Sequence, residues 1–205
     1  MPELSNIQTY VLTDELNFRN SLNKFKKVLR KLSLWNEELE SKFLQFDWIE
    51  EENGFVYSSL ITLDYQQLDC FEYSIRPLAM IVPGKESKWF SFNFLTPSYE
   101  LRAFYSGSKE IHYRNDVLGL VKKLAHALHD EFNETGIYFA DEAQDGVDLK
   151  GLTRKDYSKL WNFDFAIIPN TLKDIYSEVP STHRIIEYPS YFEAYYFEKW
   201  PALNI

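Results

Sequence analysis

The chain has 205 residues, of which 45% are hydrophobic and 26% charged, a composition typical of a soluble globular protein with a substantial core. Its formal net charge of −9 argues against nucleic-acid binding, because phosphate contacts need clustered Lys and Arg. Cys70 is the single cysteine, which excludes an intrachain disulfide and a cysteine-rich zinc site and indicates a reducing compartment. With no secretory signal and no apolar run of about 18 residues, we expect a cytoplasmic protein without membrane contact.

Two helices are predicted in the first part of the chain. The first spans residues 14–32, with Thr13 as its cap and the cations from Lys24 to Lys31 on a solvated face. Its apolar stripe, at the three-four spacing of a helix, consists of Phe18, Leu22, Phe25, Leu29 and Leu32. A second, shorter helix is predicted from Asn36 to about Phe43.

Alternating apolar residues between positions 55 and 105 predict an antiparallel sheet with one packed face. The alternating runs are Phe55-Tyr57-Ser59-Ile61-Leu63, Phe71-Tyr73-Ile75, Phe90-Phe92-Phe94 and Leu101-Ala103-Tyr105. Proline and glycine punctuate these runs at Pro77, Pro83-Gly84, Pro97 and Gly107.

The second half of the chain adds a strong helix over residues 116–132, with Val117, Val121, Leu124 and Leu128 as its buried stripe. The elements predicted after it are a strand at 137–140, a polar loop at 141–151, a short helix at 153–162, a strand at 163–168, a helical turn at 172–177 and an extended segment at 184–188. Residues 190–199 fit either a capped helix or an aromatic strand. The whole pattern predicts one α+β domain over residues 1–205, an antiparallel sheet flanked by an N-terminal and a central helix, with a weak boundary near 141–152.

The strongest lead for catalysis is the run from His126 to Glu131. Two histidines three residues apart, His126 and His129, can share a metal ion on a helix, and Asp130 or Glu131 could complete the site. However, helical geometry places His126 roughly opposite the apolar stripe, so a solvated face is the favoured interpretation.

Other catalytic patterns are missing or incomplete. The seven glycines are scattered, so the chain has no phosphate-binding loop, and a lone strand residue such as Cys70 is typical of a small buried hydrophobe. The acidic segment that starts at Asp141 departs from a calcium loop at Ala143 and Leu152. We therefore expect no cofactor and no bound metal.

An acidic stretch and a surplus of aromatic residues point instead to binding. From Asp130 to Asp148 the chain carries seven acids and no Lys or Arg, and 17% of all residues are aromatic. The steering charges that we predict for a basic protein partner are Glu134, Asp141, Glu142, Asp145 and Asp148. The predicted aromatic anchors, from the run at 188–200, are Tyr191, Tyr195 and Trp200.

These features favour a non-catalytic acidic protein that binds or sequesters a protein partner. Acidic inhibitors of basic nuclease toxins follow the same physical logic, so an immunity-type inhibitor of a basic toxin or nuclease is the concrete form of this hypothesis. One alternative is a hydrolase that uses His126, His129 and nearby carboxylates, with or without a metal. Another is a structural subunit whose aromatic surface forms a homo-oligomer.

Overall fold

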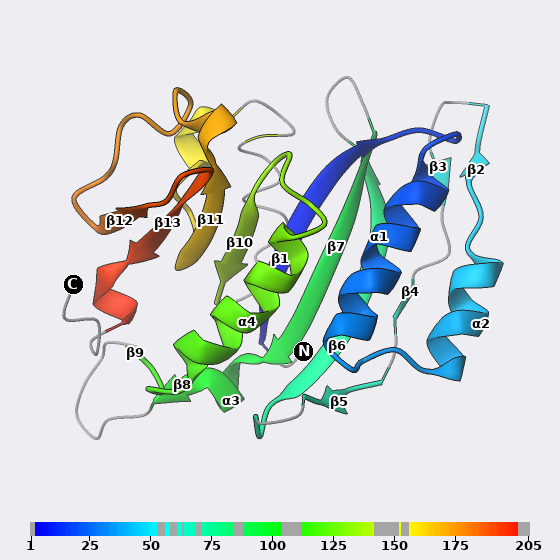
Figure 1. Cartoon of the computed structure of the whole chain (residues 1–205), viewed down its shortest axis with the longest axis horizontal. Coiled ribbons are helices and arrows are strands. Elements are labelled where there is room, and N and C mark those ends of the chain that lie inside the picture. The colour runs from blue at the N-terminus through cyan, green and yellow to red at the C-terminus, as the bar shows by residue number, and fades with distance from the viewer. Residues whose placement is uncertain are drawn as a thin grey trace.

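The computed structural model describes residues 3–52, 56–57, 61–62, 64–68, 71–83, 88–103, 112–141, 152 and 156–200. Within these residues, nine antiparallel strands form one large sheet in the order β12-β13-β11-β10-β1-β7-β6-β4, and β5 adds to β6. Figure 1 shows that helices α1 (Phe18–Lys31) and α4 (Val117–His129) lie side by side on one face of this sheet. The molecule is an α+β protein, which confirms the fold class predicted from the alternating pattern.

The strands of the large sheet are β1 (Leu4–Thr13), β4 (Ile61–Thr62), β5 (Gln66–Gln67), β6 (Ser74–Pro83), β7 (Lys88–Pro97), β10 (Ile137–Ala140), β11 (Phe165–Pro169), β12 (His183–Glu187) and β13 (Tyr191–Tyr196). Two small ladders pair β2 (Ile49–Glu50) with β3 (Val56–Tyr57) and β8 (Arg102–Ala103) with β9 (His112–Tyr113). The remaining elements are α2 (Glu37–Gln45), α3 (Ser98–Leu101) and the 3-10 turns η1 (Tyr157–Lys159), η2 (Asn170–Leu172) and η3 (Phe197–Lys199).

The core lies between the sheet and the two long helices. Alternate residues of β7 point to the helices, and Phe90, Phe92 and Phe94 are completely buried there. Phe25 of α1 packs on this row, with its ring 4.8 Å from that of Phe92 and 5.8 Å from that of Phe94. The rings of Phe92 and Phe132 stack at 4.7 Å, which connects the row to the end of α4. The apolar stripe of the helix and the alternating phenylalanines of the strand therefore pack together in one aromatic core.

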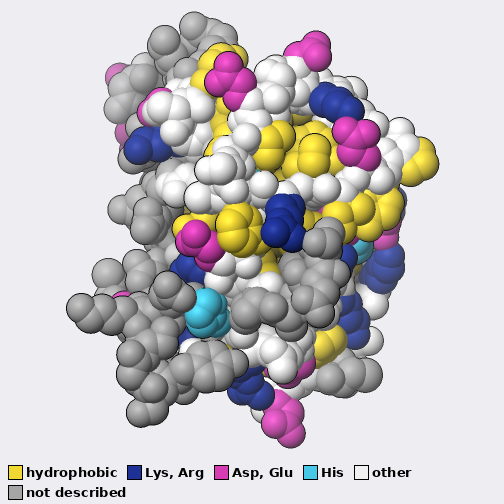
Figure 2. Space-filling view, turned by 90° about the vertical axis from the view of Figure 1, so that its left-hand side faces the viewer, with side chains coloured by type: hydrophobic (Ala, Val, Ile, Leu, Met, Phe, Trp, Pro, Cys, Tyr) yellow, Lys and Arg dark blue, Asp and Glu magenta, His cyan; other side chains and the backbone are white. Residues whose placement is uncertain are grey.

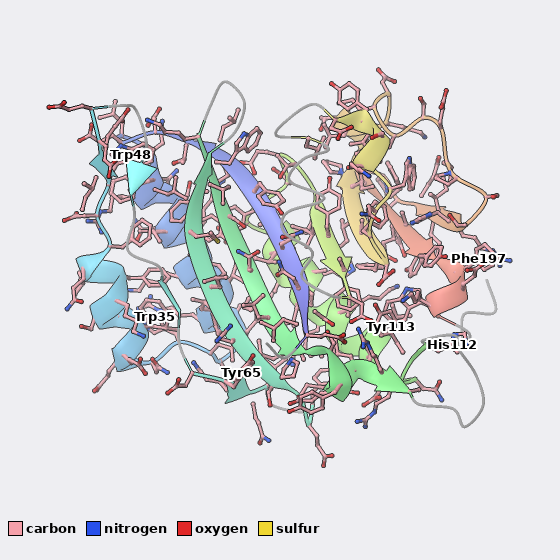
Figure 3. All side chains as sticks on the ribbon, turned by 180° about the vertical axis from the view of Figure 1, so that it is seen from behind. Trp35, Trp48, Tyr65, His112, Tyr113 and Phe197 are labelled. Atoms are coloured by element: carbon pink, nitrogen blue, oxygen red, sulfur yellow. The ribbon has the colours of Figure 1, made fainter. Side chains whose placement is uncertain are left out.

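The opposite face of the central strands carries buried polar side chains (Figure 3). The Asn6 amide donates to Gln8 at 2.8 Å and to Asn93 at 3.1 Å, and the Asn93 amide donates to the Ser91 hydroxyl at 2.8 Å. Farther along the sheet this face is apolar, where residues 160–176 contribute Leu160, Phe163 and Tyr176 to a second core cluster.

Local polar groups set where the first two helices begin. The Asp14 carboxylate accepts from the backbone N–H groups of Leu16 and Asn17 at 2.9 and 2.8 Å, so α1 begins after this turn rather than at the predicted Thr13 cap. Asn36 caps α2, because its side chain accepts from the backbone N–H of Leu39 at 2.9 Å.

Two of the predicted elements differ in the structure, and a third, left open between helix and strand, is a strand. The run that includes Leu101 and Ala103 is not one strand: Leu101 ends the short helix α3, which follows Pro97 at the end of β7, and Ala103 lies in the two-residue strand β8. The helix predicted at 153–162 contains only the 3-10 turn η1 among its described residues. The ambiguous segment 190–199 forms the strand β13 followed by η3.

Strands from both sides of the predicted boundary at 141–152 belong to the same sheet. β10 pairs directly with β11, with Ile137 opposite Ile167. Among the described residues, no helix has both the length and the apolar character needed to cross a membrane.

Candidate functional site

A polar cluster that contains two of the candidate site residues lies where α4 packs against β13, around the side chain of Glu193. Alternation along β13 points Glu193 toward the helices, on the same face as Tyr195 and Tyr191. Only 1% of the Glu193 side chain is exposed. A carboxylate in this position needs partners for its charge, and α4 supplies them.

Two residues one turn apart on α4 bind the Glu193 carboxylate. The Nε2 atom of His126 lies 3.0 Å from Oε1, and the Nζ atom of Lys122 lies 2.9 Å from Oε2. The Tyr195 hydroxyl also donates to Oε2, within the same strand. Burial raises the pKa of Glu193, but the hydrogen bonds from His126, Tyr195 and Lys122 outweigh it and lower the pKa to about 2. Glu193 is therefore a buried anion that holds α4 to β13.

Tyr191 joins the second histidine to this cluster. Its ring lies 4.8 Å from that of His129, 6.0 Å from that of His126 and 4.7 Å from that of Tyr188. Burial, and then the nearby His126, lower the pKa of His129, and its Nδ1 atom has no hydrogen-bond partner among the described residues. The fold thus brings together His126, His129 and Tyr191, which the sequence assigned to separate hypotheses.

The contact between Glu193 and His126 resembles the part of a catalytic site that orients a general base. A buried carboxylate that fixes one nitrogen of an imidazole is how many enzymes orient a general base, and 39% of the His126 side chain remains exposed. The side chains considered for a metal-assisted hydrolase have other partners, since His126 is bound to Glu193, while Asp130 and Glu131 pair with Lys31 and Lys27. Among the described residues, no group of three or more His, Cys, Asp or Glu side chains could hold a metal ion.

The first acids of the acidic stretch form ion pairs with other parts of the protein. Three ion pairs cross from α1 to the end of α4: Lys24 to Glu134 at 3.2 Å, Lys27 to Glu131 at 3.3 Å, and Lys31 to Asp130. The three lysines stand at i, i+3 and i+7, so they share one side of α1. Part of the predicted solvated face of α1 is therefore a charged contact between helices.

Asp141 is buried rather than presented to solvent. Its side chain is 3% exposed, and it accepts hydrogen bonds from Ser5 at 2.8 Å and from Nε of Arg102 at 2.9 Å. Its backbone N–H donates to Asp164, whose pKa burial raises. Glu142, Asp145 and Asp148, together with Cys70, lie outside the described residues.

Two of the three predicted aromatic anchors lie in the core. Tyr195 is completely buried, and Trp200 is nearly so, with its indole N–H donating to the backbone oxygen of Asp164 at 2.8 Å. Tyr191 alone of the three is partly exposed. Tyr195 is buried because β13 lies between β11 and β12 in the sheet, whereas Trp200 follows η3 and packs on the ring of Tyr113 at 4.3 Å.

A surface that the prediction missed lies where β1 ends, α1 begins and α2 ends. Three contacts bring these segments together: the rings of Phe18 and Trp48 lie 5.8 Å apart, Arg19 pairs with Asp47 at 2.9 Å, and Lys88 pairs with Glu50 at 2.6 Å. We call this surface the acidic end; it comprises Leu12, Asp14, Glu15, Leu16, Leu44, Asp47, Ile49, Glu50, Glu51 and Glu52.

The acidic end combines exposed apolar side chains with acids. The exposed fractions are 89% for Leu16, 75% for Leu44, 57% for Leu12 and 53% for Ile49. All six acids of the acidic end are exposed. The run Asp47-Trp48-Ile49-Glu50-Glu51-Glu52 was the sequence signal for this surface, since three consecutive acids follow two large apolar residues.

The far side of the molecule, at the β12 edge, has a different character. Figure 2 shows apolar side chains there mixed with charges of both signs. The apolar residues near this edge are less exposed, at 36% for Ile185, 38% for Ile175 and 40% for Val179. The acidic end is therefore the more unusual of the two surfaces.

Comparisons with protein-family models, with curated proteins and with solved structures find no match to this chain.

Proposed function

We propose that this protein is a non-catalytic cytoplasmic binding protein that captures and sequesters a basic protein partner through its acidic end. An immunity-type inhibitor of a basic toxin or nuclease is the concrete form of the proposal. The observation that carries it is the acidic end, where Leu16 and Leu44, the two most exposed large apolar side chains described, stand among six acids. Exposed apolar groups surrounded by polar residues are typical of protein-binding surfaces.

The unpaired charges of this surface support a role in steering. Glu15 and Glu52 are exposed and form no ion pair among the described residues, so their charges are available to a partner. A negative surface raises the rate at which a basic partner associates, and this effect weakens as salt shortens the Debye length to about 8 Å. By contrast, Asp130, Glu131 and Glu134 already pair with lysines of α1.

A pull-down from native-host lysate tests the proposal. The wild type is compared at low and high salt with the variant Glu15→Lys/Glu52→Lys and with Asp174→Lys/Glu178→Lys. The control pair makes the same charge change at exposed acids between β11 and β12. We expect the wild type and the control to retain one basic protein in stoichiometric amount and to release it at high salt.

We expect only the Glu15→Lys/Glu52→Lys variant to lose the bound basic protein. If the wild type retains no basic protein, or if both double variants retain it equally, the proposal is wrong. Light scattering on the isolated chain separates capture of a partner from self-association, because a homo-oligomer would not stay monomeric.

A second candidate is the hydrolase, which the contact between His126 and Glu193 favours. Its general base would be His126, oriented by the Glu193 carboxylate at 3.0 Å. The variant His126→Ala tests it against a panel of ester and phosphoester substrates. Loss of a hydrolytic activity that the wild type displays would favour this reading over the binding protein.

A further inference from the structure

A groove runs between α1 and α2 next to the acidic end. Its volume is about 200 Å³, and its lining residues are Arg19, Leu22, Asn23, Lys26, Glu40, Phe43 and Leu44. Leu22 and Phe43 are buried at its base, while Leu44 is exposed at its rim. An apolar cavity of about 150 Å³ holds one benzene ring, so this groove has room for one large apolar side chain.

Contacts between the two helices keep the groove in shape. Nη1 of Arg19 donates to the backbone oxygen of Phe43 at 3.1 Å, and the other arm of the same guanidinium pairs with Asp47 at 2.9 Å. Lys26 pairs with Glu40 at 2.9 Å and lies over the ring of Trp35 at 4.6 Å. Both cations that line the groove thus have an acidic partner, which leaves its apolar base as the feature available to a ligand.

The surroundings of the groove are strongly negative. The acids on this part of the chain are Asp14, Glu15, Glu37, Glu38, Glu40, Asp47, Glu50, Glu51 and Glu52. The cations on the same side are Arg19, Lys26, Arg30, Lys42 and Lys88, since Lys24, Lys27 and Lys31 pair with acids at the end of α4. The excess of acids over cations complements a basic segment, and the apolar base complements an uncharged anchor in it.

We infer that this groove receives one leucine or phenylalanine side chain from a basic segment of the partner, with lysines or arginines on both sides of that anchor. The anchor packs against Leu22, Phe43 and Leu44, and the flanking cations reach Glu15 and Glu37, which form no ion pair among the described residues. This inference rests on the proposed function, because it specifies the recognition element of the same basic partner.

Titration of the full chain with synthetic peptides, followed by NMR, tests the inference. The probe is a short peptide of lysine and alanine with one central leucine. Two controls replace the leucine by alanine or all the lysines by glutamate. Because burial of the leucine side chain favours binding, we expect the leucine peptide to bind about tenfold more tightly than the alanine peptide and to shift the amide signals of Leu22 and Phe43.

Two variants locate the binding site. Leu44→Ser removes the rim of the groove, and Val179→Ser is the control, because Val179 is an exposed apolar residue between β11 and β12 that neither lines the groove nor belongs to the acidic end. Both side chains are at the surface, so both variants should fold. We expect Leu44→Ser to weaken binding of the leucine peptide several-fold and Val179→Ser to leave it unchanged.

The outcomes separate this inference from the function on which it rests. If the leucine and alanine peptides bind equally, or if Val179→Ser weakens binding as much as Leu44→Ser, the groove is not the anchor site, although the proposal of a basic partner still stands. If the glutamate peptide binds as well as the lysine peptides, or if neither lysine peptide binds at low salt, the preference for a basic partner is itself wrong.

Discussion

The imidazole of His126 on α4 donates from Nε2 to the buried carboxylate of Glu193 on β13, 67 residues farther along the chain, at 3.0 Å. Lys122, one helical turn before His126, binds the other oxygen of the same carboxylate. One side chain thereby joins the central helix to the C-terminal part of the sheet. Removal of a partner from such a buried charge is costly, because the remaining group loses solvation without compensation.

Replacement of Glu193 should change the acid stability of the protein. The folded pKa of about 2 lies below the ordinary value of 4.5, so the carboxylate stabilises the fold at pH values above 4.5 and loses this contribution as the pH falls toward 2. The contribution is on the order of 3 kcal/mol at neutral pH. We expect Glu193→Gln to unfold at lower urea concentration at neutral pH and to show a flatter decline between pH 4.5 and 2.

The matched control for this experiment is Glu187→Gln on β12. Glu187 is exposed and pairs with Lys173 at the surface, so its replacement should change the free energy of unfolding by less than about 1 kcal/mol. If the stability of the wild type and of Glu193→Gln declines equally between pH 4.5 and 2, Glu193 is not a stabilised anion.

Because of the three ion pairs between α1 and the end of α4, we expect reversal of their charges to change the free energy of unfolding. The first variant reverses the acids: Asp130→Lys, Glu131→Lys and Glu134→Lys. It places like charges together, and we expect a loss of about 1–3 kcal/mol in the free energy of unfolding, smaller at high salt. The second variant adds the reciprocal changes Lys24→Glu, Lys27→Glu and Lys31→Glu, which should restore most of the loss. Absence of this rescue would mean that the pairs do not interact in solution.

Because His183 is buried, we expect the protein to lose stability in mildly acidic solution. His183 is buried among aromatic rings, with Nε2 3.1 Å from the backbone oxygen of Phe163, and burial lowers its pKa below the ordinary value of 6.5. The unfolded chain therefore binds the proton more readily, so stability present above pH 6.5 declines as the pH falls through the folded pKa. We expect His183→Gln to show a shallower decline than the wild type in thermal melts below pH 6.5. His112→Gln, at a more exposed ring, serves as the control, and a wild-type slope in His183→Gln would refute this reading.

Two glycines should respond in opposite directions to substitution by alanine. Gly136, before β10, has a φ of +89°, and a Cβ there would lie 2.9 Å from the backbone oxygen of Ile167. Gly136→Ala should therefore cost about 2 kcal/mol or more. Gly119 lies in α4, where a Cβ would approach only the ring of Phe71 at 3.8 Å, so Gly119→Ala should stabilise the protein by about 0.5–1 kcal/mol. Urea denaturation measures the free energy of unfolding of both variants. If both substitutions change it in the same direction, the backbone conformation described for one of the two glycines is wrong.

Much of the secondary structure could be predicted because it depends on local periods. The three-four spacing of Phe18, Leu22 and Phe25 marks α1, and the alternation of Phe90 and Phe92 marks β7. Predictions failed where a proline or a short turn decides the backbone, as after Pro97. The placement of Asp141 in a buried ion pair with Arg102 could not be predicted, because the two residues belong to elements that are distant in the sequence.

The sequence by itself determined the α+β class, the two long helices, the aromatic core of β7 and the excess of acids, since each depends on composition or on spacing within one element. Only the tertiary structure decided which charges remain available. It pairs Glu134 with Lys24 across two helices and buries Tyr195 under α4, while it leaves Leu16 and Glu52 exposed at one end. The physical reason is that burial and ion pairing depend on contacts between distant segments, which no local period encodes.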